Sequence, residues 1–209
     1  MIERIAMPPP GAGATQEDRA RADFYALIAR LFHAGPDVAL LAAIAGADAI
    51  AGAGEGGPLA AAWSALRAAA ATMDAGAARE EYDSVFVGTG KAEITPYASH
   101  YLAGSLQERV LVRLREELVE MGLERNRGTV EYEDHLSGLC EVMRQQILFF
   151  GSSDVALRKQ KSFYSGYLLP WYAGFCATVM ATPNTYFYKH VANFTKAFLD
   201  VERDSFELI

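Results

Sequence analysis

The chain has 209 residues, 51% of them hydrophobic, and carries a formal net charge of -7. This length supports a single domain whose core needs neither disulfides nor metal, and the acidic balance argues against nucleic acid, which binds chiefly through Lys and Arg. No apolar run approaches the roughly 18 to 20 residues of a membrane-spanning helix, and the N-terminus lacks a basic-then-apolar signal pattern. We therefore expect a soluble cytoplasmic protein in which Cys140 and Cys176 are buried thiols.

The N-terminal half shows helical spacing interrupted by glycine and proline. Residues 1–15 contain three consecutive prolines and two glycines, which predicts a flexible tail before a folded domain over residues 16–209. Apolar residues at a helical period predict a first helix that ends at Gly35-Pro36. Asp37 is expected to cap a second helix, and Pro58 to open a third after a glycine-rich connection.

A fourth helix carries Tyr82, Val85 and Phe86 and is expected to end at Gly88, before a loop that runs to Ser99. The carboxylates Glu80, Glu81 and Asp83 flank its apolar positions. We predict that they form a solvated helix face, with contact to the arginines of a partner as the alternative.

The second half of the chain repeats the helical pattern. An amphipathic helix over residues 110–121 ends at Gly122, and a polar hinge follows near residues 122–130. Further helices are expected over residues 136–150 and from Asp154, with Pro170 as a break or a new start and a C-terminal helix that opens near Pro183-Asn184. No segment shows the alternation of strands, so the sequence predicts an all-α, single-domain bundle of about eight to ten helices.

Two polar segments are candidates for a binding site. Glu131, Glu133, Asp134 and His135 stand at a helix start, where acidic groups interact favourably with unpaired amides, so on physical grounds alone a charged cap is the preferred interpretation. The other segment combines aromatic rings, a hydroxyl and an imidazole, and could equally be an ordinary packed loop: Pro96, Tyr97, Ser99, His100 and Tyr101.

In their order and spacing, four segments together resemble the TorD/DmsD/NarJ-type redox enzyme maturation chaperones: residues 80–88, 96–101, 131–136 and 168–171. These chaperones are cytoplasmic, all-helical proteins that hold molybdenum-enzyme subunits before twin-arginine export, and the resemblance extends over residues 18–202. The family carries a Glu-Pro-x-Asp-His pattern that helps to form the binding site for the client's signal peptide, and the loop over residues 96–101 lies beside it. Tyr132 stands where the family has proline, and Tyr97 replaces a larger ring.

The resemblance implies binding without catalysis. The expected partners are the catalytic subunit of a molybdenum-cofactor oxidoreductase and its twin-arginine signal peptide, and the cofactor belongs to that client, so no cofactor or metal is expected on this chain. The family also implies a monomer that can form dimers by exchanging helical halves. The implied client-binding residues are Pro96, Tyr97, Ser99, His100, Tyr101, Glu131, Glu133, Asp134 and His135.

Two other functions stay open: a helical enzyme using His100, Asp134 and His135 as acid/base groups, or a scaffold protein without a maturation role. A nucleotide site at Gly88-Thr89-Gly90-Lys91 is disfavoured, because the first glycine of a phosphate-binding loop is missing and Ala92 follows the lysine. Paired Glu-x-x-His motifs, which a di-iron helical bundle would need, are absent from the sequence.

Overall fold

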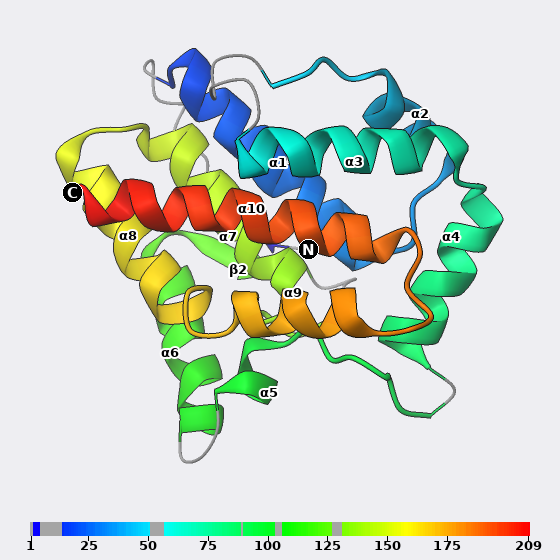
Figure 1. Ribbon diagram of the computed structural model, residues 1–209. Coiled ribbons are helices and arrows are strands. Elements are labelled where there is room, and N and C mark those ends of the chain that lie inside the picture. The colour runs from blue at the N-terminus through cyan, green and yellow to red at the C-terminus, as the bar shows by residue number, and fades with distance from the viewer. Residues whose placement is uncertain (1, 5–13, 51–56, 89, 103–105, 127–130) are drawn as a thin grey trace. The chain divides into compact units, whose positions relative to one another are not determined.

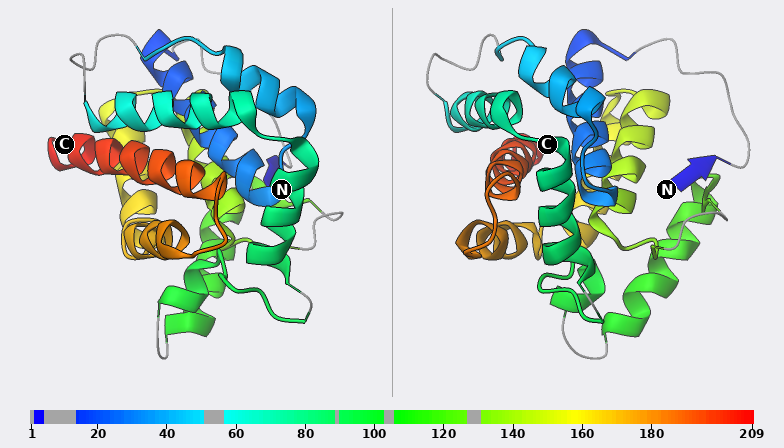
Figure 2. Two further views of the ribbon diagram at one scale, coloured as in Figure 1. Left: turned by 45° about the vertical axis from the view of Figure 1, so that its right-hand side comes forward. Right: turned by 90° about the vertical axis from the view of Figure 1, so that its right-hand side faces the viewer.

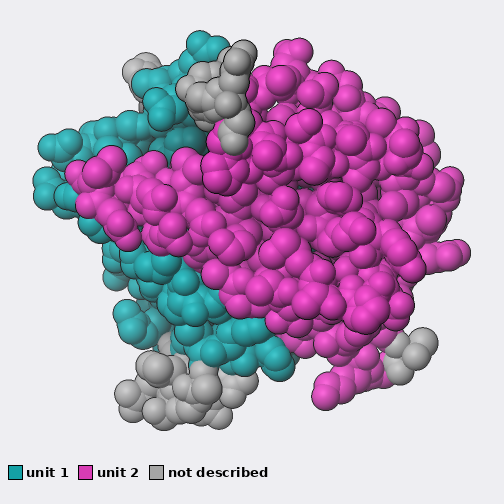
Figure 3. Space-filling model, in the orientation of Figure 1, with its two compact units in different colours: residues 1–32, 96–171, 209 teal, residues 33–95, 172–208 magenta. Residues whose placement is uncertain are grey.

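The computed structural model describes residues 2–4, 14–50, 57–88, 90–102, 106–126 and 131–209. This part of the chain contains ten α-helices, one π-helical turn and two short strands (Figure 1). The prediction of an all-helical protein is confirmed. Contacts divide the chain into two compact units, coloured separately in Figure 3: unit 1 comprises residues 1–32, 96–171 and 209, and unit 2 comprises residues 33–95 and 172–208.

Unit 1 is built mainly from helices that bury one apolar face each. In the first helix, Tyr25, Ile28 and Leu31 recur at helical spacing and are fully buried. Within the unit the last two helices pack against each other, and Ser153 caps the final one by accepting a hydrogen bond from the Ala156 amide. The helices of unit 1 are α1 (Gln16–His33), α5 (Ala98–Tyr101), α6 (Leu106–Glu120), α7 (Leu136–Phe150) and α8 (Asp154–Tyr167).

A small antiparallel ribbon also belongs to unit 1. Strand β1 (Ile2–Arg4) pairs with β2 (Leu123–Arg125), and Ile2 and Leu123 are buried. The structure thus differs from the predicted tail at residues 2–4 and from the predicted hinge at residues 123–125. Three residues are too few for strand alternation to be recognised in the sequence. The rest of these predictions, at residues 5–13 and 127–130, lies outside the described part of the chain.

Unit 2 has the C-terminal helix at its centre. Helix α10 lies between α3 and α9, as the views in Figures 1 and 2 agree. The ring centroids of Trp63 and Phe194 are 5.2 Å apart and join α3 to α10, while those of Phe86 and Tyr188 are 5.1 Å apart. The elements of this unit are α2 (Val38–Gly46), α3 (Pro58–Thr72), α4 (Ala75–Tyr82), the π-helical turn η1 (Asp83–Val87), α9 (Tyr172–Ala181) and α10 (Tyr188–Glu207).

Several helix boundaries in unit 2 follow from local chemistry. The Asp37 carboxylate accepts a hydrogen bond from the Leu40 amide at 2.7 Å and caps α2, and Pro58 is the first residue of α3, both as predicted. Gly35 allows a close approach, because a Cβ atom at this position would lie 2.8 Å from the Arg79 Cα atom. Short-range signals were therefore sufficient to locate these boundaries.

Helix α10 begins at Tyr188, later than the start that was predicted near Pro183-Asn184. Glu81 accepts hydrogen bonds from the backbone amides of Tyr186, Phe187 and Tyr188 at 2.9, 2.9 and 2.7 Å. The prediction of a solvated carboxylate is wrong for Glu81, which is buried and caps a helix that begins more than a hundred residues later, while Glu80 is exposed as expected. Cys140 and Cys176 are both buried thiols, as predicted. None of the described helices combines the length and apolar character needed to span a membrane.

Candidate functional site

All nine residues of the predicted binding site lie in unit 1, on two segments that run antiparallel to each other. Tyr97 forms an isolated antiparallel bridge with His135. The Ala98 amide donates to the Asp134 carbonyl at 3.0 Å, and the Leu136 amide donates to the Pro96 carbonyl at 2.9 Å. The structure therefore brings residues 96–101 against the start of α7. The predicted loop ends earlier than expected, because Ala98–Tyr101 form the short helix α5. We keep the word loop for residues 96–101 and call this arrangement the loop–helix site.

Asp134 is the most unusual group of the loop–helix site. Its side chain is fully buried, and its Oδ2 atom accepts a hydrogen bond from the Ser99 amide at 2.9 Å. Its other oxygen, Oδ1, is also buried and has no hydrogen-bond partner among the described residues. Removing a carboxylate oxygen from water without a new partner is costly, so such a group in a folded protein calls for an explanation.

His135, and not Asp134, is the capping residue of α7. Its Nδ1 atom accepts a hydrogen bond from the Ser137 amide at 3.1 Å and lies 2.7 Å from the Ser137 hydroxyl. With Nδ1 as acceptor, the neutral ring carries its proton on Nε2. The Tyr97 ring meets the imidazole edge-on with centroids 4.8 Å apart, so hydrogen bonding and ring packing together fix its orientation.

Glu133 is paired with two arginines of its own chain. Arg115 donates to both carboxylate oxygens at 3.2 and 3.0 Å, and Arg125 lies 3.6 Å away. Burial acts to raise the pKa of Glu133, but the hydrogen bonds from Arg115 and the two positive charges outweigh it, so the pKa lies below its usual value. Neither arginine was singled out in the sequence, because both precede the motif by up to 18 residues.

Gly138 permits the tight turn at the start of α7. A Cβ atom at this position would lie 2.8 Å from the carbonyl oxygen of Glu133, which is backbone and cannot rotate away. A glycine in the first turn of a helix weakens it, so this residue is explained by the close approach of residues 133–135. The sequence signal was the Ser137-Gly138 pair inside an apolar helical pattern, which was not recognised.

The accessible edge of the loop–helix site is formed by Tyr97, Glu131 and Tyr132. Tyr132 is exposed, and its ring centroid lies 6.5 Å from that of Tyr97. Glu131 is partly exposed, and its carbonyl accepts a hydrogen bond from Arg125. Burial, followed by the negative charges of Glu131 and Asp134, raises the pKa of Tyr97 to about 12. This edge therefore presents aromatic surface in a field of negative charge.

The last two residues of the predicted loop have different environments. His100 is exposed, and its ring meets that of Tyr101 with centroids 5.0 Å apart. Tyr101 in turn stacks on Trp171 at 5.2 Å, and the Trp171 indole donates to the Tyr167 carbonyl at 2.6 Å. The stack links the loop to the segment of residues 168–171, the fourth segment of the resemblance. Among the described residues, no group of three or more His, Cys, Asp or Glu side chains is placed to hold a metal ion.

The architecture and the loop–helix site define an all-helical protein in which a loop is clamped against a helix start. Residues 54–177, more than half of the chain, match the sequence profile of the nitrate reductase delta subunit family, and the chain belongs to this family. Its resemblance to the TorD/DmsD/NarJ-type redox enzyme maturation chaperones is thereby confirmed.

The fold is similar to that of a candidate redox enzyme maturation protein from Archaeoglobus fulgidus, whose crystal structure superposes with a TM-score of 0.53 at 18% sequence identity. The superposition covers 95% of this chain and 98% of the other, so the two share their fold over nearly the whole length. No curated protein sequence matches the chain.

Proposed function

We propose that this protein is a cytoplasmic chaperone that binds the twin-arginine signal peptide and the catalytic subunit of a molybdenum-cofactor oxidoreductase. It assists cofactor insertion and withholds the client from export until the client is complete. Membership of the nitrate reductase delta subunit family and the shared fold with a candidate maturation protein support this role. The loop–helix site is where we expect the signal peptide to bind.

The observation that carries the proposal is the buried Oδ1 atom of Asp134, which has no hydrogen-bond partner among the described residues. A guanidinium group is the natural complement of such an oxygen, because charge-assisted hydrogen bonds are stronger than neutral ones. Since Asp134 is fully buried, an arginine reaches Oδ1 only when the loop of residues 96–101 moves away from α7. In the closed arrangement the Ser99 amide and the backbone pairing hold that loop in place.

The accessible edge of the site provides the first contact. Glu131 offers a partly exposed carboxylate, and the rings of Tyr97 and Tyr132 offer surfaces on which a guanidinium can stack. Glu133 is expected to act indirectly, because Arg115 and Arg125 already neutralise its charge. We therefore assign recognition to Glu131 and Asp134, and positioning of the loop to His135 and Ser99.

Calorimetry with a synthetic peptide tests the proposal directly. The peptide carries two adjacent arginines followed by a leucine-rich segment, and a matched peptide replaces both arginines with glutamine. The affinity of the arginine peptide is expected to fall as salt rises, and the glutamine peptide is expected to bind roughly tenfold more weakly or worse. Equal affinity for the two peptides at every salt concentration would remove the carboxylate site from the proposal.

The client is identified by capture from the native cell. The full chain is used as bait, and bound proteins are identified by mass spectrometry. A chaperone of this class is expected to retain the catalytic subunit of a redox enzyme with its signal peptide still attached. Recovery of mature subunits that have already lost their signal peptide would contradict retention before export.

A further inference from the structure

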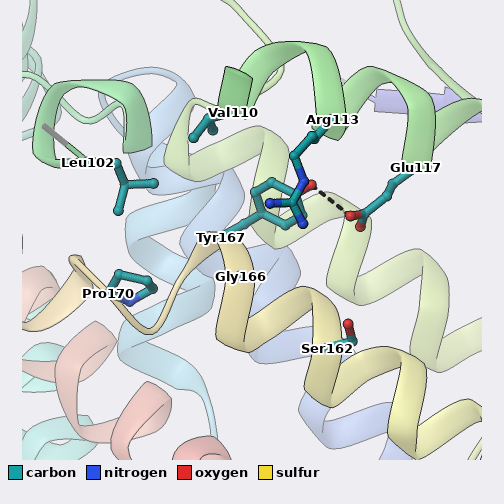
Figure 4. A pocket seen from close by; sticks show the side chains of 8 residues that line it. All are labelled: Leu102, Val110, Arg113, Glu117, Ser162, Gly166, Tyr167 and Pro170. Atoms are coloured by element: carbon teal, nitrogen blue, oxygen red, sulfur yellow. Dashed lines mark hydrogen bonds between the residues drawn. The ribbon is translucent and has the colours of Figure 1, made fainter. Parts of the chain in front are cut away.

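A concave site lies in unit 1, and none of the nine predicted residues lines it. A pocket of about 370 Å³ opens between α6 and α8 (Figure 4). It is also lined by Leu102, which directly follows α5, and by Pro170, which follows α8. We call it the α6–α8 pocket. Its apolar wall is formed by Leu102, Val110, Pro170 and the Tyr167 ring. This volume is at the small end of ligand pockets, roughly 300 to 1,000 Å³, and suits one or two side chains.

The polar side of the pocket carries one donor group and one acceptor group. Glu117 accepts a hydrogen bond from the Tyr167 hydroxyl at 2.8 Å through Oε1, as drawn in Figure 4. Arg113 lies one helical turn before Glu117 and forms no hydrogen bond or ion pair with any described residue. The pocket therefore combines an apolar wall with a guanidinium donor and a second carboxylate oxygen, Oε2, for which no protein donor is described.

These features match an extended peptide better than a small ion. The backbone of an extended peptide presents carbonyl acceptors and amide donors, which Arg113 and Glu117 complement, while its side chains supply the apolar surface. An isolated anion would be attracted by Arg113 but repelled by Glu117, and an isolated cation would meet the opposite arrangement.

Two residues that line the pocket are sequence neighbours of rings at the loop–helix site. Leu102 directly follows Tyr101, and Pro170 directly precedes Trp171. Tyr101 and Trp171 are the two stacked rings that connect the loop to the end of α8. The pocket therefore lies close to the segment on which we expect the arginines of the client peptide to bind.

We propose that the α6–α8 pocket receives an apolar side chain of the client peptide, from the segment that follows the arginine pair. This inference rests on the proposed function, which it deepens by assigning the apolar part of the signal to a particular place. Burial of a leucine side chain then contributes affinity in addition to the charged contacts. Arg113 and Glu117 hold the peptide backbone at the rim.

The inference is tested by substitutions that fill part of the pocket and leave the core unchanged. Ser162 and Ser165 are both exposed on α8, but only Ser162 lines the pocket, so Ser162→Leu and Ser165→Leu form a matched pair on one helix. Gly166→Leu and Gly174→Leu form a second pair, because an added Cβ atom at either position meets nothing within 4 Å and only Gly166 lines the pocket. All four changes favour helix formation, and thermal unfolding confirms that each variant folds.

Each variant is titrated with the leucine-rich arginine peptide and with a peptide whose leucines are replaced by serine. Ser162→Leu and Gly166→Leu are expected to bind the leucine peptide roughly tenfold more weakly than their controls, and to bind the serine peptide as their controls do. Equal affinities within each pair for the leucine peptide overturn the inference, as does an equal loss for both peptides.

The glutamine peptide separates this inference from the proposed function. If wild-type protein binds the arginine and glutamine peptides equally, while Ser162→Leu still weakens both, the pocket holds an apolar side chain and the twin-arginine function fails. If the wild-type protein binds the arginine peptide more tightly than the glutamine peptide, and the pocket variants bind as their controls do, the proposed function stands and the pocket inference fails. If the wild-type chain binds none of these peptides, both are overturned.

Discussion

Two buried carboxylates, one in each unit, use their hydrogen-bonding capacity in opposite ways. Glu81 in unit 2 accepts from three consecutive backbone amides and uses both oxygens. Asp134 in unit 1 accepts from the Ser99 amide with Oδ2, while Oδ1 is buried without a hydrogen-bond partner among the described residues. Glu81 is 8% exposed and Asp134 is fully buried, so burial alone does not distinguish a structural carboxylate from a candidate binding group. The difference lies in whether the fold itself satisfies the oxygens.

Glu133 and His135 are intermediate cases within unit 1. Glu133 is satisfied by Arg115 and Arg125, and His135 by the amide of Ser137. Both were predicted to contact a client, yet both are already engaged in holding residues 131–136 in place. We therefore expect the stability of the fold to depend most on Glu81, less on Glu133 and His135, and least on Asp134.

The largest effect is expected for Glu81→Ala. This substitution leaves three amides at the start of α10 without an acceptor, two of them on the buried residues Phe187 and Tyr188. A buried donor left unpaired costs about 1 to 3 kcal/mol, so we expect the free energy of unfolding to fall by roughly 3 kcal/mol or more. Urea unfolding followed by circular dichroism measures the change.

Two controls accompany this experiment. Glu80→Ala, at an exposed position on the same helix, is expected to change the free energy of unfolding by less than about 0.5 kcal/mol. Glu81→Gln keeps one acceptor oxygen and is expected to fall between the two. A Glu81→Ala variant as stable as Glu80→Ala would show that the amides of residues 186–188 find other partners.

Much of the fold was predictable because its signals are local. The cap at Asp37 and the proline at the first position of α3 are local signals at a helix start. The helical segments before Gly88, Gly122 and Gly151 end where these glycines adopt a positive φ. The apolar face of each predicted helix was recognised from the spacing of residues within that segment alone. These features need no knowledge of which elements meet.

The roles of the carboxylates were not predictable for the same reason. The amides that Glu81 accepts from belong to residues 186–188, which follow it by 105 to 107 positions. Asp134 and Ser99 are 35 positions apart, and Arg115 precedes Glu133 by 18 positions. A single sequence shows a carboxylate on a helix face or at a helix start, and both places suit solvent as well as they suit a partner. The resemblance located the loop–helix site, whereas the contacts inside it depended on tertiary structure.

The second-largest effect on the free energy of unfolding is expected for Glu133→Gln, and it depends on pH. Arg115 and Arg125 hold the pKa of Glu133 below its usual value of 4.5, so its ionised form stabilises the fold above pH 4.5 and this contribution is lost as the pH falls through and below that value. Glu133→Gln is expected to lower the free energy of unfolding by about 1 to 2 kcal/mol at neutral pH. The difference between wild type and variant should shrink in urea titrations below pH 4.5.

Asp18 provides the comparison for this titration. Burial acts to raise its pKa, but hydrogen bonds from Ser152 and Thr15 and the charge of Arg21 lower it overall, so wild type and Glu133→Gln both lose the Asp18 contribution in acid. A constant difference between the two chains at every pH would mean that the Glu133 charge does not contribute to stability.

The third effect is the loss of a helix cap in His135→Ala. The Ser137 amide then has no side-chain acceptor, which typically costs about 0.5 to 2 kcal/mol. His135→Asn restores a good capping oxygen and is expected to recover most of that stability. If the imidazole acts only as a cap, His135→Asn should also bind the arginine peptide like wild type. Weak binding by a stable His135→Asn chain would instead give the ring a direct part in the site.

The smallest effect on folding is expected for Asp134→Asn, and it is the variant that tests the comparison most directly. The asparagine oxygen can still accept from the Ser99 amide, while the change removes a buried charge whose second oxygen the described fold does not satisfy. The free energy of unfolding should therefore change by less than about 1 kcal/mol, because the lost charge no longer has to be desolvated.

Binding should respond differently to the same change. Without its charge, residue 134 offers a client guanidinium only a neutral contact, and we expect affinity for the arginine peptide to fall roughly tenfold while affinity for the glutamine peptide stays the same. Calorimetry beside thermal unfolding gives both quantities for one protein sample. If Asp134→Asn unfolds several kcal/mol more easily, the carboxylate is structural like Glu81, because its charge must then have been satisfied within the fold. If it folds and binds like wild type, Oδ1 is not the place where an arginine is recognised, and the partly exposed Glu131 becomes the carboxylate to test.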